Sequence, residues 1–168
     1  MNILKSAAII AVGLVAFAGC KPAAVDTTAD EAAIKDATRA WVAAYTAGDA
    51  DAVTALYAED AIVMPPGAPT AVGHAAIREF IASDSAASKA AGVKLAINDD
   101  DTVVISGDLA AHSGSYFVTD ASGATVDTGM YMDASQKKDG KWHIVRDIWN
   151  SNKAPAPAAE PAAPAATN

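Results

Sequence analysis

Two titratable side chains, Asp147 and His112, lie within runs of β-branched and aromatic residues that are typical of β-strands. A carboxylate on a mostly apolar surface loses hydration, which raises its pKa and suits it to act as a general base or a polar anchor. His112 alternates with Gly114 and Tyr116, so these three residues share one face of their strand. If that face lines a pocket that also contains Asp147, then His112 and Asp147 could work as an acid–base pair. The alternatives are a structural ion pair for Asp147 and a hydrogen-bonded or surface position for His112.

Five of the ten aromatic residues are Trp or Tyr side chains that could contact a ligand: Trp41, Tyr45, Tyr116, Tyr131 and Trp149. Each of these rings buries apolar area and carries a polar group that can form a hydrogen bond. The same residues serve equally well as ordinary core, so their types alone leave both interpretations open.

Other sequence patterns give no indication of a metal or a cofactor. His74 and His143 have no spacing to another His or Cys that would bind zinc. The acidic run from Asn98 to Thr102 lacks the glycine and the terminal glutamate of an EF-hand loop, and we predict a solvated turn there. Phosphate-binding loops, dinucleotide fingerprints and nucleophile elbows are missing from the sequence. We therefore expect no cofactor and no bound metal.

The charge of the chain argues against nucleic acid as a partner. The formal net charge is −8 over 168 residues. The sequence contains no stripe of Lys or Arg that could displace counterions from phosphates. An acidic surface of this kind most simply keeps the protein soluble.

The N-terminus has the features of an export signal. Lys5 precedes an apolar run over residues 7–18, which is too short to span a bilayer. Cys20 ends this region and is the only cysteine, so a disulfide within the chain is excluded. The small residues before Cys20 resemble the lipobox of bacterial lipoproteins, which implies cleavage before Cys20 and lipid attachment to it. Lys21 stands where that class places an aspartate for inner-membrane retention, so we expect an outer-membrane protein facing the periplasm.

The remaining chain divides into a tether, one domain and a tail. Residues 1–19 form the signal peptide, residues 20–27 the tether and residues 28–152 a single domain of ordinary size. Residues 153–168 are rich in Ala and Pro, and we predict a disordered tail there.

Within the domain, helix signals come first and strand signals follow. A capping box at Thr28–Glu31 begins a long amphipathic helix that ends at Gly48, and Asp49 caps a second, short helix whose buried face carries Val53, Leu56 and Tyr57. A strand follows at residues 61–64, and a third helix runs from Gly73 to near Gly92. Period-2 patterns then predict strands near residues 93–98, 102–106, 109–118, 125–136 and 142–151. The fold class is α+β: three helices packed in the concave face of a curved, mostly antiparallel sheet, with a pocket between them.

Four sequence segments in this order resemble the SnoaL-like branch of the nuclear transport factor 2-like superfamily. They lie at residues 47–61, 65–69, 73–80 and 139–151. The last segment, with its Trp-x-Ile-x-x-Asp-x-Trp-Asn-Ser pattern, resembles the domain of unknown function called SgcJ/EcaC-like. The resemblance implies a cone-shaped fold with an internal pocket, and the family often dimerises through its sheet. Because members include isomerases, cyclases, dehydratases and binding-only domains, the resemblance leaves the activity open.

Matching residues to the ketosteroid isomerase branch argues against that reaction. The catalytic base of that branch falls on Pro65, which cannot take a proton. The oxyanion-hole tyrosine falls on Trp41, and the buried acid falls near Met132, with Asp133 one residue away. The same matching places Val145, Asp147 and Trp149 on the pocket face.

These observations predict a lipid-anchored cell-envelope domain that binds a small, largely apolar ligand. The predicted ligand contacts are Trp41, Tyr45, Met64, Tyr116, Met132 and Trp149. A first alternative is a cofactor-free enzyme that uses Asp147, with His112, for proton transfer on a carbonyl-containing or polyketide-like substrate. A second alternative is a dimeric scaffold whose pocket is filled by its own side chains.

Overall fold

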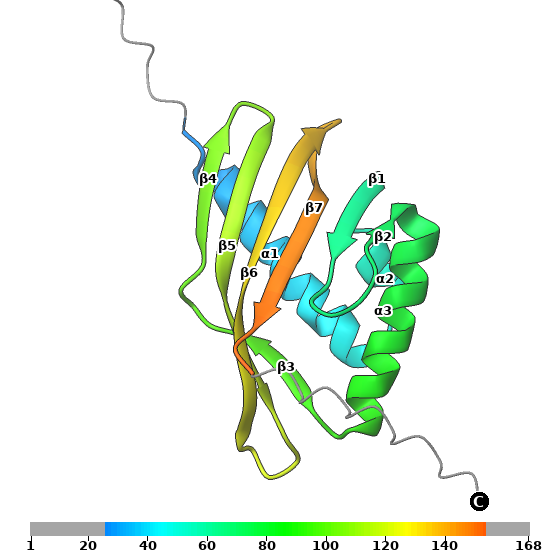
Figure 1. Ribbon diagram of the computed structural model, residues 1–168. Coiled ribbons are helices and arrows are strands. Elements are labelled where there is room, and N and C mark those ends of the chain that lie inside the picture. Colours follow the sequence, from blue (N-terminus) through cyan, green and yellow to red (C-terminus); the bar gives the residue numbers. More distant parts are fainter. Residues whose placement is uncertain (1–25, 154–168) are drawn as a thin grey trace, which may run out of the picture.

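The computed structural model describes residues 26–153, and the predicted signal peptide, Cys20, most of the tether and the Ala/Pro-rich tail lie outside them. Three helices lie on one side of a curved sheet, and Figure 1 shows helix α1 crossing behind the strands. The elements in chain order are α1 (Thr28–Ala47), α2 (Ala50–Thr54), β1 (Tyr57–Met64), β2 (Ala71–Val72), α3 (Gly73–Ala90), β3 (Lys94–Ile97), β4 (Thr102–Ser106), β5 (Leu109–Thr119), β6 (Thr125–Lys138) and β7 (Lys141–Ser151). The predicted α+β class is confirmed.

Local sequence signals explain the transition between the first two helices. Gly48 takes a left-handed conformation with φ of 81°, which ends α1. The Asp49 side chain accepts a hydrogen bond from the Ala52 backbone N–H and caps α2, as predicted. The predicted capping box at Thr28 is wrong, since Thr27 precedes the first helical residue, makes no side-chain cap hydrogen bond to the helix backbone, and donates its hydroxyl to the Glu31 carboxylate at 2.6 Å.

The sheet joins the first strand of the chain to the last. Its strand order is β2-β1-β7-β6-β5-β3, and β4 also pairs with β5. Strand β1 pairs with β7 in parallel, and the other pairings are antiparallel. Strand β7 therefore lies in the middle of the sheet, between β6 and β1.

The core lies between the helices and the concave face of the sheet. Buried side chains from α2 and α3, including Val53, Ile77 and Ile81, pack with Val63 of β1 and Ile144 of β7. No helix among residues 26–153 is long and apolar enough to cross a membrane.

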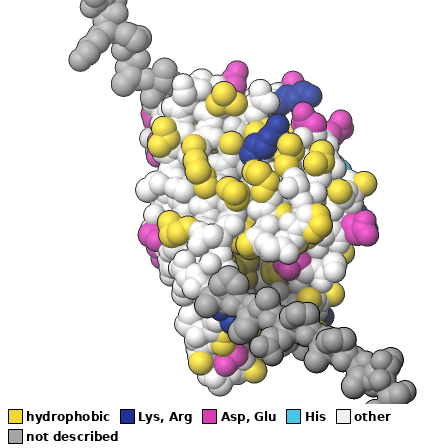
Figure 2. Space-filling view, viewed as in Figure 1, with side chains coloured by type: hydrophobic (Ala, Val, Ile, Leu, Met, Phe, Trp, Pro, Cys, Tyr) yellow, Lys and Arg dark blue, Asp and Glu magenta, His cyan; other side chains and the backbone are white. Residues whose placement is uncertain are grey.

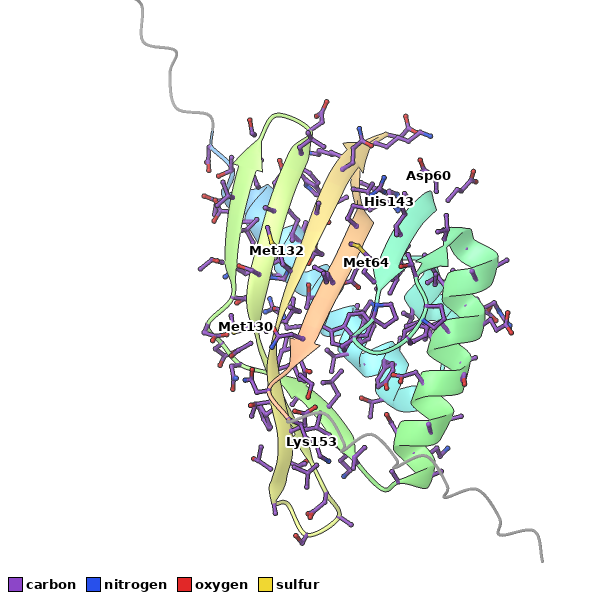
Figure 3. All side chains as sticks on the ribbon, viewed as in Figure 1. Asp60, Met64, Met130, Met132, His143 and Lys153 are labelled. Atoms are coloured by element: carbon purple, nitrogen blue, oxygen red, sulfur yellow. The ribbon has the colours of Figure 1, made fainter. Side chains whose placement is uncertain are left out.

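The opposite, convex face of the sheet carries several apolar side chains. Met132 of β6 pairs with Ile148 of β7, which pairs in turn with Met64 of β1, so all three project from the same face. Met132 is 52% exposed. Figure 3 shows Met64, Met130 and Met132 on the sheet surface away from α1, and Figure 2 shows apolar side chains scattered over this surface. Met64 and Met132 are therefore not pocket residues, which corrects their predicted role.

Candidate functional site

A cavity of about 230 Å³ lies between α1, α3 and the concave face of the sheet. Trp41 and Tyr45 of α1 line it, and their rings are stacked with centroids 5.1 Å apart. Tyr116 and Trp149 line it from the sheet. These four aromatic residues were predicted as ligand contacts, and the structure brings them together around one space.

Asp147 lines this cavity from the middle of the central strand β7. The residue is only 9% exposed. The Tyr57 hydroxyl donates to Asp147 Oδ2 at 2.6 Å, and the Trp41 indole N–H donates to the Tyr57 hydroxyl at 2.8 Å. These two hydrogen bonds fix the orientation of the carboxyl group relative to the cavity.

Burial raises the pKa of Asp147 from 3.8 to about 7, because the carboxylate loses hydration. The hydrogen bond from Tyr57 opposes this rise, and the negative charge of Asp133 adds to it. Asp133 is the cross-strand neighbour of Asp147, so the two carboxyl groups share one face of the sheet. A carboxyl group with a pKa of about 7 can both release and accept a proton at neutral pH.

Tyr57 is a site residue that the sequence analysis placed on the buried face of α2. Helix α2 instead ends at Thr54, and Tyr57 is the first residue of β1. Its pKa is raised well above 10.0, by burial first and then by the negative charge of Asp147. Tyr57 therefore stays protonated and serves as a hydrogen-bond donor that holds Asp147.

His112 is completely buried on β5 and lies between two carboxylates. Its Nδ1 is 2.9 Å from Asp133 Oδ2, and its Nε2 is 3.1 Å from Asp101 Oδ2. Burial lowers the pKa of His112, but the hydrogen bonds to Asp133 and Asp101 outweigh it and leave the pKa raised above 6.5. With a carboxylate at each ring nitrogen, the doubly protonated imidazolium is the form that satisfies both hydrogen bonds.

His112 forms no hydrogen bond with Asp147, which corrects the predicted acid–base pair, and a third residue, Asp133, lies beside each of them. His112 bonds to Asp133, and Asp133 stands opposite Asp147 on the neighbouring strand. The Ser135 hydroxyl also donates to Asp133, at 3.0 Å. Asp133 thus lies between His112 and Asp147, and of these two residues it is hydrogen-bonded to His112 alone.

The acidic run 98–102 is an exposed connection between β3 and β4, as predicted, except at Asp101. The Asp101 side chain is 11% exposed and reaches inward to His112. The Lys35 ammonium group donates to the Asp101 carboxylate at 3.2 Å and to its backbone carbonyl at 2.8 Å. These contacts hold the run against α1 and the sheet, and nothing in the local sequence indicates them.

A bulge in the sheet changes which residues of β7 face the cavity. The pairing of β6 with β7 shifts between Ala134 and Ser135, which pair with Arg146 and Ile144 respectively. Val145 has no partner in this register, and Ile144 lines the cavity instead. The prediction that Val145 faces the pocket is therefore wrong, while the placement of Asp147 and Trp149 agrees with the structure.

The cavity also contains two carboxylates that the sequence analysis did not select. Asp84 of α3 accepts a hydrogen bond from the Tyr45 hydroxyl at 2.5 Å. Asp127 of β6 accepts hydrogen bonds from the Ser151 hydroxyl at 2.8 Å. Within residues 26–153, no group of three or more His, Cys, Asp or Glu side chains is arranged to hold a metal ion.

Three helices over a curved sheet, with a pocket between them, define the class of cone-shaped α+β domains. The sequence pattern of the SnoaL-like domain matches residues 38–144, which is more than half of the chain. The chain belongs to the SnoaL-like family. A comparison with curated protein sequences gives no match.

Solved structures with the same fold include proteins from several bacteria. A nuclear transport factor 2-like protein with a cystatin-like fold from Novosphingobium aromaticivorans has a TM-score of 0.63 and 25% identity, over 69% of this chain and 77% of that chain. A ketosteroid isomerase-like protein from Erwinia carotovora has a TM-score of 0.59 and 24% identity, over 76% of this chain and 99% of that chain. A protein of unknown function from Pseudomonas putida has a TM-score of 0.65 and 18% identity, over 73% of this chain and 86% of that chain. The latter two likenesses concern the fold alone.

Proposed function

We propose that the chain binds a small, largely apolar molecule in the cavity between α1, α3 and the sheet. The observation that carries this proposal is the space of about 230 Å³ walled by aromatic and aliphatic side chains. A concave apolar site with a few polar groups is the usual form of a small-molecule site. The same space counts against a scaffold whose pocket is filled by its own side chains.

Filling the cavity should block binding of a neutral aromatic dye. Val118 lines the cavity, and a phenylalanine there would take up space that the dye needs. We expect Val118→Phe to weaken binding of N-phenyl-1-naphthylamine by about tenfold, because the displaced dye loses apolar contacts with the wall that are worth roughly 1 kcal/mol or more per methylene-sized group. Val104→Phe is the matched control, because Val104 is 70% exposed on β4. Dye fluorescence in a titration measures both affinities. Equal affinities for the two variants, or no binding by the wild-type protein, would contradict the proposal.

A second candidate function is proton transfer on a bound carbonyl compound. The observation that favours it is Asp147, a buried carboxyl group with a pKa of about 7 that faces the cavity. Asp147 would take a proton from a carbon next to the carbonyl group and return it elsewhere, while Tyr57 and Trp41 hold the carboxyl group in place. Asp147→Asn keeps an acceptor for the Tyr57 hydroxyl but cannot carry a proton. This candidate therefore requires that Asp147→Asn loses turnover and keeps ligand binding.

We further propose that lipid on Cys20 holds the domain at the outer membrane, facing the periplasm. The support comes from the apolar run at residues 7–18 and from its ending at the only cysteine. Cys20→Ala should move the protein from the membrane fraction to the soluble fraction of the cell. The measurement is fractionation followed by immunoblotting, and a variant that stays in the membrane fraction would refute lipidation.

A further inference from the structure

The wall of the cavity is strongly acidic. The charge of the wall restricts the class of ligand more than the shape of the cavity does. Four carboxyl groups line it: Asp84, Asp127, Asp133 and Asp147. The described residues that line the cavity include no Lys, Arg or His. An anionic ligand would therefore enter a space in which every charged group repels it.

Most of this negative charge has no cation beside it. Asp133 has His112 as an ionic partner. Asp84 and Asp127 have hydrogen bonds from hydroxyl groups, and neither takes part in an ion pair within residues 26–153. Carboxylates in a partly closed cavity are costly unless a positive charge accompanies them.

Four aromatic residues line the same cavity as these carboxylates. The stacked pair Trp41 and Tyr45 forms one wall, and Tyr116 and Trp149 belong to the opposite wall on the sheet. The face of an aromatic ring attracts a cation, with a contribution of about 0.5–2 kcal/mol that grows as the cation loses water. Rings and carboxylates together are the combination that recognises ammonium groups.

We propose that the ligand of this cavity is a small organic ammonium ion, with an apolar body against the aromatic walls and its charged group toward the carboxylates. This inference rests on the proposed binding function and names the class of ligand for the same site. The net charge of −8 would in addition draw cations toward the protein.

Three probes that share a phenyl ring and differ in charge test this inference. They are 2-phenylethylammonium, the neutral 2-phenylethanol and the anionic 3-phenylpropionate, each titrated into the purified protein by calorimetry at pH 7.5. We expect the cation to bind at least about tenfold more tightly than the alcohol, because one charge-assisted contact is worth roughly 1.5–3 kcal/mol. The anion should bind more weakly than the alcohol.

Variants that each remove one carboxylate from the cavity test whether these carboxylates cause the preference for the cation. Asp84→Asn and Asp127→Asn should each weaken binding of the cation by about fivefold or more and leave binding of the alcohol unchanged. Asp60→Asn is the matched control, because Asp60 is exposed on β1, where Figure 3 labels it, and is not among the residues that line the cavity. It removes the same charge from the protein and should leave both affinities unchanged.

The outcomes separate this inference from the proposed function. Equal binding of the cation and the alcohol, or an equal loss in Asp60→Asn and in both cavity variants, would overturn the inference and leave a binding pocket for neutral molecules. The absence of binding by all three probes would overturn the binding function as well.

Discussion

The Asp147→Asn variant should be more stable than the wild-type protein at pH 8. In the wild-type protein the carboxyl group of Asp147 is buried in the cavity wall, beside the like charge of Asp133. Its pKa of about 7 in the folded state lies above the ordinary value of 3.8. The difference corresponds to on the order of 4 kcal/mol, at about 1.36 kcal/mol per pKa unit. An asparagine carries no charge, so it avoids this cost and still accepts the hydrogen bond from Tyr57.

The effect should depend on pH in a defined direction. Between pH 3.8 and about 7 the folded protein holds a proton on Asp147 that the unfolded chain has lost. The contribution of Asp147 to stability is therefore fully present below pH 3.8 and is lost as the pH rises through about 7. The difference in free energy of unfolding between Asp147→Asn and the wild-type protein should be small at pH 4 and largest above pH 7. Because His112 titrates in both proteins, its own contribution largely cancels in this difference.

Asp133→Asn is the control with the opposite expected sign. It removes the carboxylate 2.9 Å from His112 Nδ1 and leaves a buried imidazolium with only Asp101 as an ionic partner. Breaking one side of a buried ion pair costs about 3–5 kcal/mol. Urea unfolding at pH 4, 6 and 8 measures all three proteins. If Asp147→Asn is destabilised at pH 8 as strongly as Asp133→Asn, then the buried charge of Asp147 is not the cost that we describe.

The order of the elements could be predicted because each boundary is a local feature. Gly48 and Asp49 are adjacent residues that end one helix and cap the next, so their meaning does not depend on distant contacts. Likewise, the strand at residues 102–106 was predicted with the bounds that the structure has. The change from helical to alternating periodicity after Gly92 marks the start of the strands, since it reflects which side chains face the core.

The partners within the site could not be predicted, because they depend on register and on long-range contacts. Asp101 reaches His112 across a strand pairing and reaches Lys35 across 66 residues of sequence. Ile144 replaces Val145 in the cavity wall because of a bulge in β7. The extra residue of a bulge reverses the alternation of side chains, so residues before it point to the opposite face from the one that a regular strand would give. Pairing of β1 with β7 was not predicted either, and it is this pairing that brings Tyr57 near Asp147.

Met132 and Asp133 show how a shift of one residue decides which side chain faces the cavity. The family resemblance placed a buried acid near Met132, with Asp133 one residue away. In the structure Asp133 faces the cavity and Met132 faces outward, because neighbouring side chains of a strand point to opposite faces. An error of one residue therefore placed a surface methionine in the position of Asp133, the carboxylate that bonds to His112 and stands opposite Asp147.

Gly129→Ala should destabilise the protein strongly, and more than the addition of a methyl group at Gly114. A Cβ at this position would overlap the backbone carbonyl oxygen of Asn150 and would lie 2.5 Å from the Tyr116 ring. Neither neighbour can move freely: Asn150 belongs to the central strand β7, and the Tyr116 hydroxyl donates to the same carbonyl at 2.8 Å. Strands β6 and β7 would have to separate, so we expect a loss of about 3 kcal/mol or more in the free energy of unfolding.

Gly114→Ala provides the comparison that isolates this mechanism. Its Cβ would lie 2.6 Å from the hydroxyl of Tyr131, which is the far end of a side chain and has no hydrogen-bond partner among the described residues. Tyr131 can shift, so the expected loss is only about 1 kcal/mol. Urea unfolding measures both variants, and similar losses would contradict the argument. Since Tyr116 lies against Gly129 and lines the cavity, the glycine is what allows this ring to lie flat on the sheet and form the pocket wall.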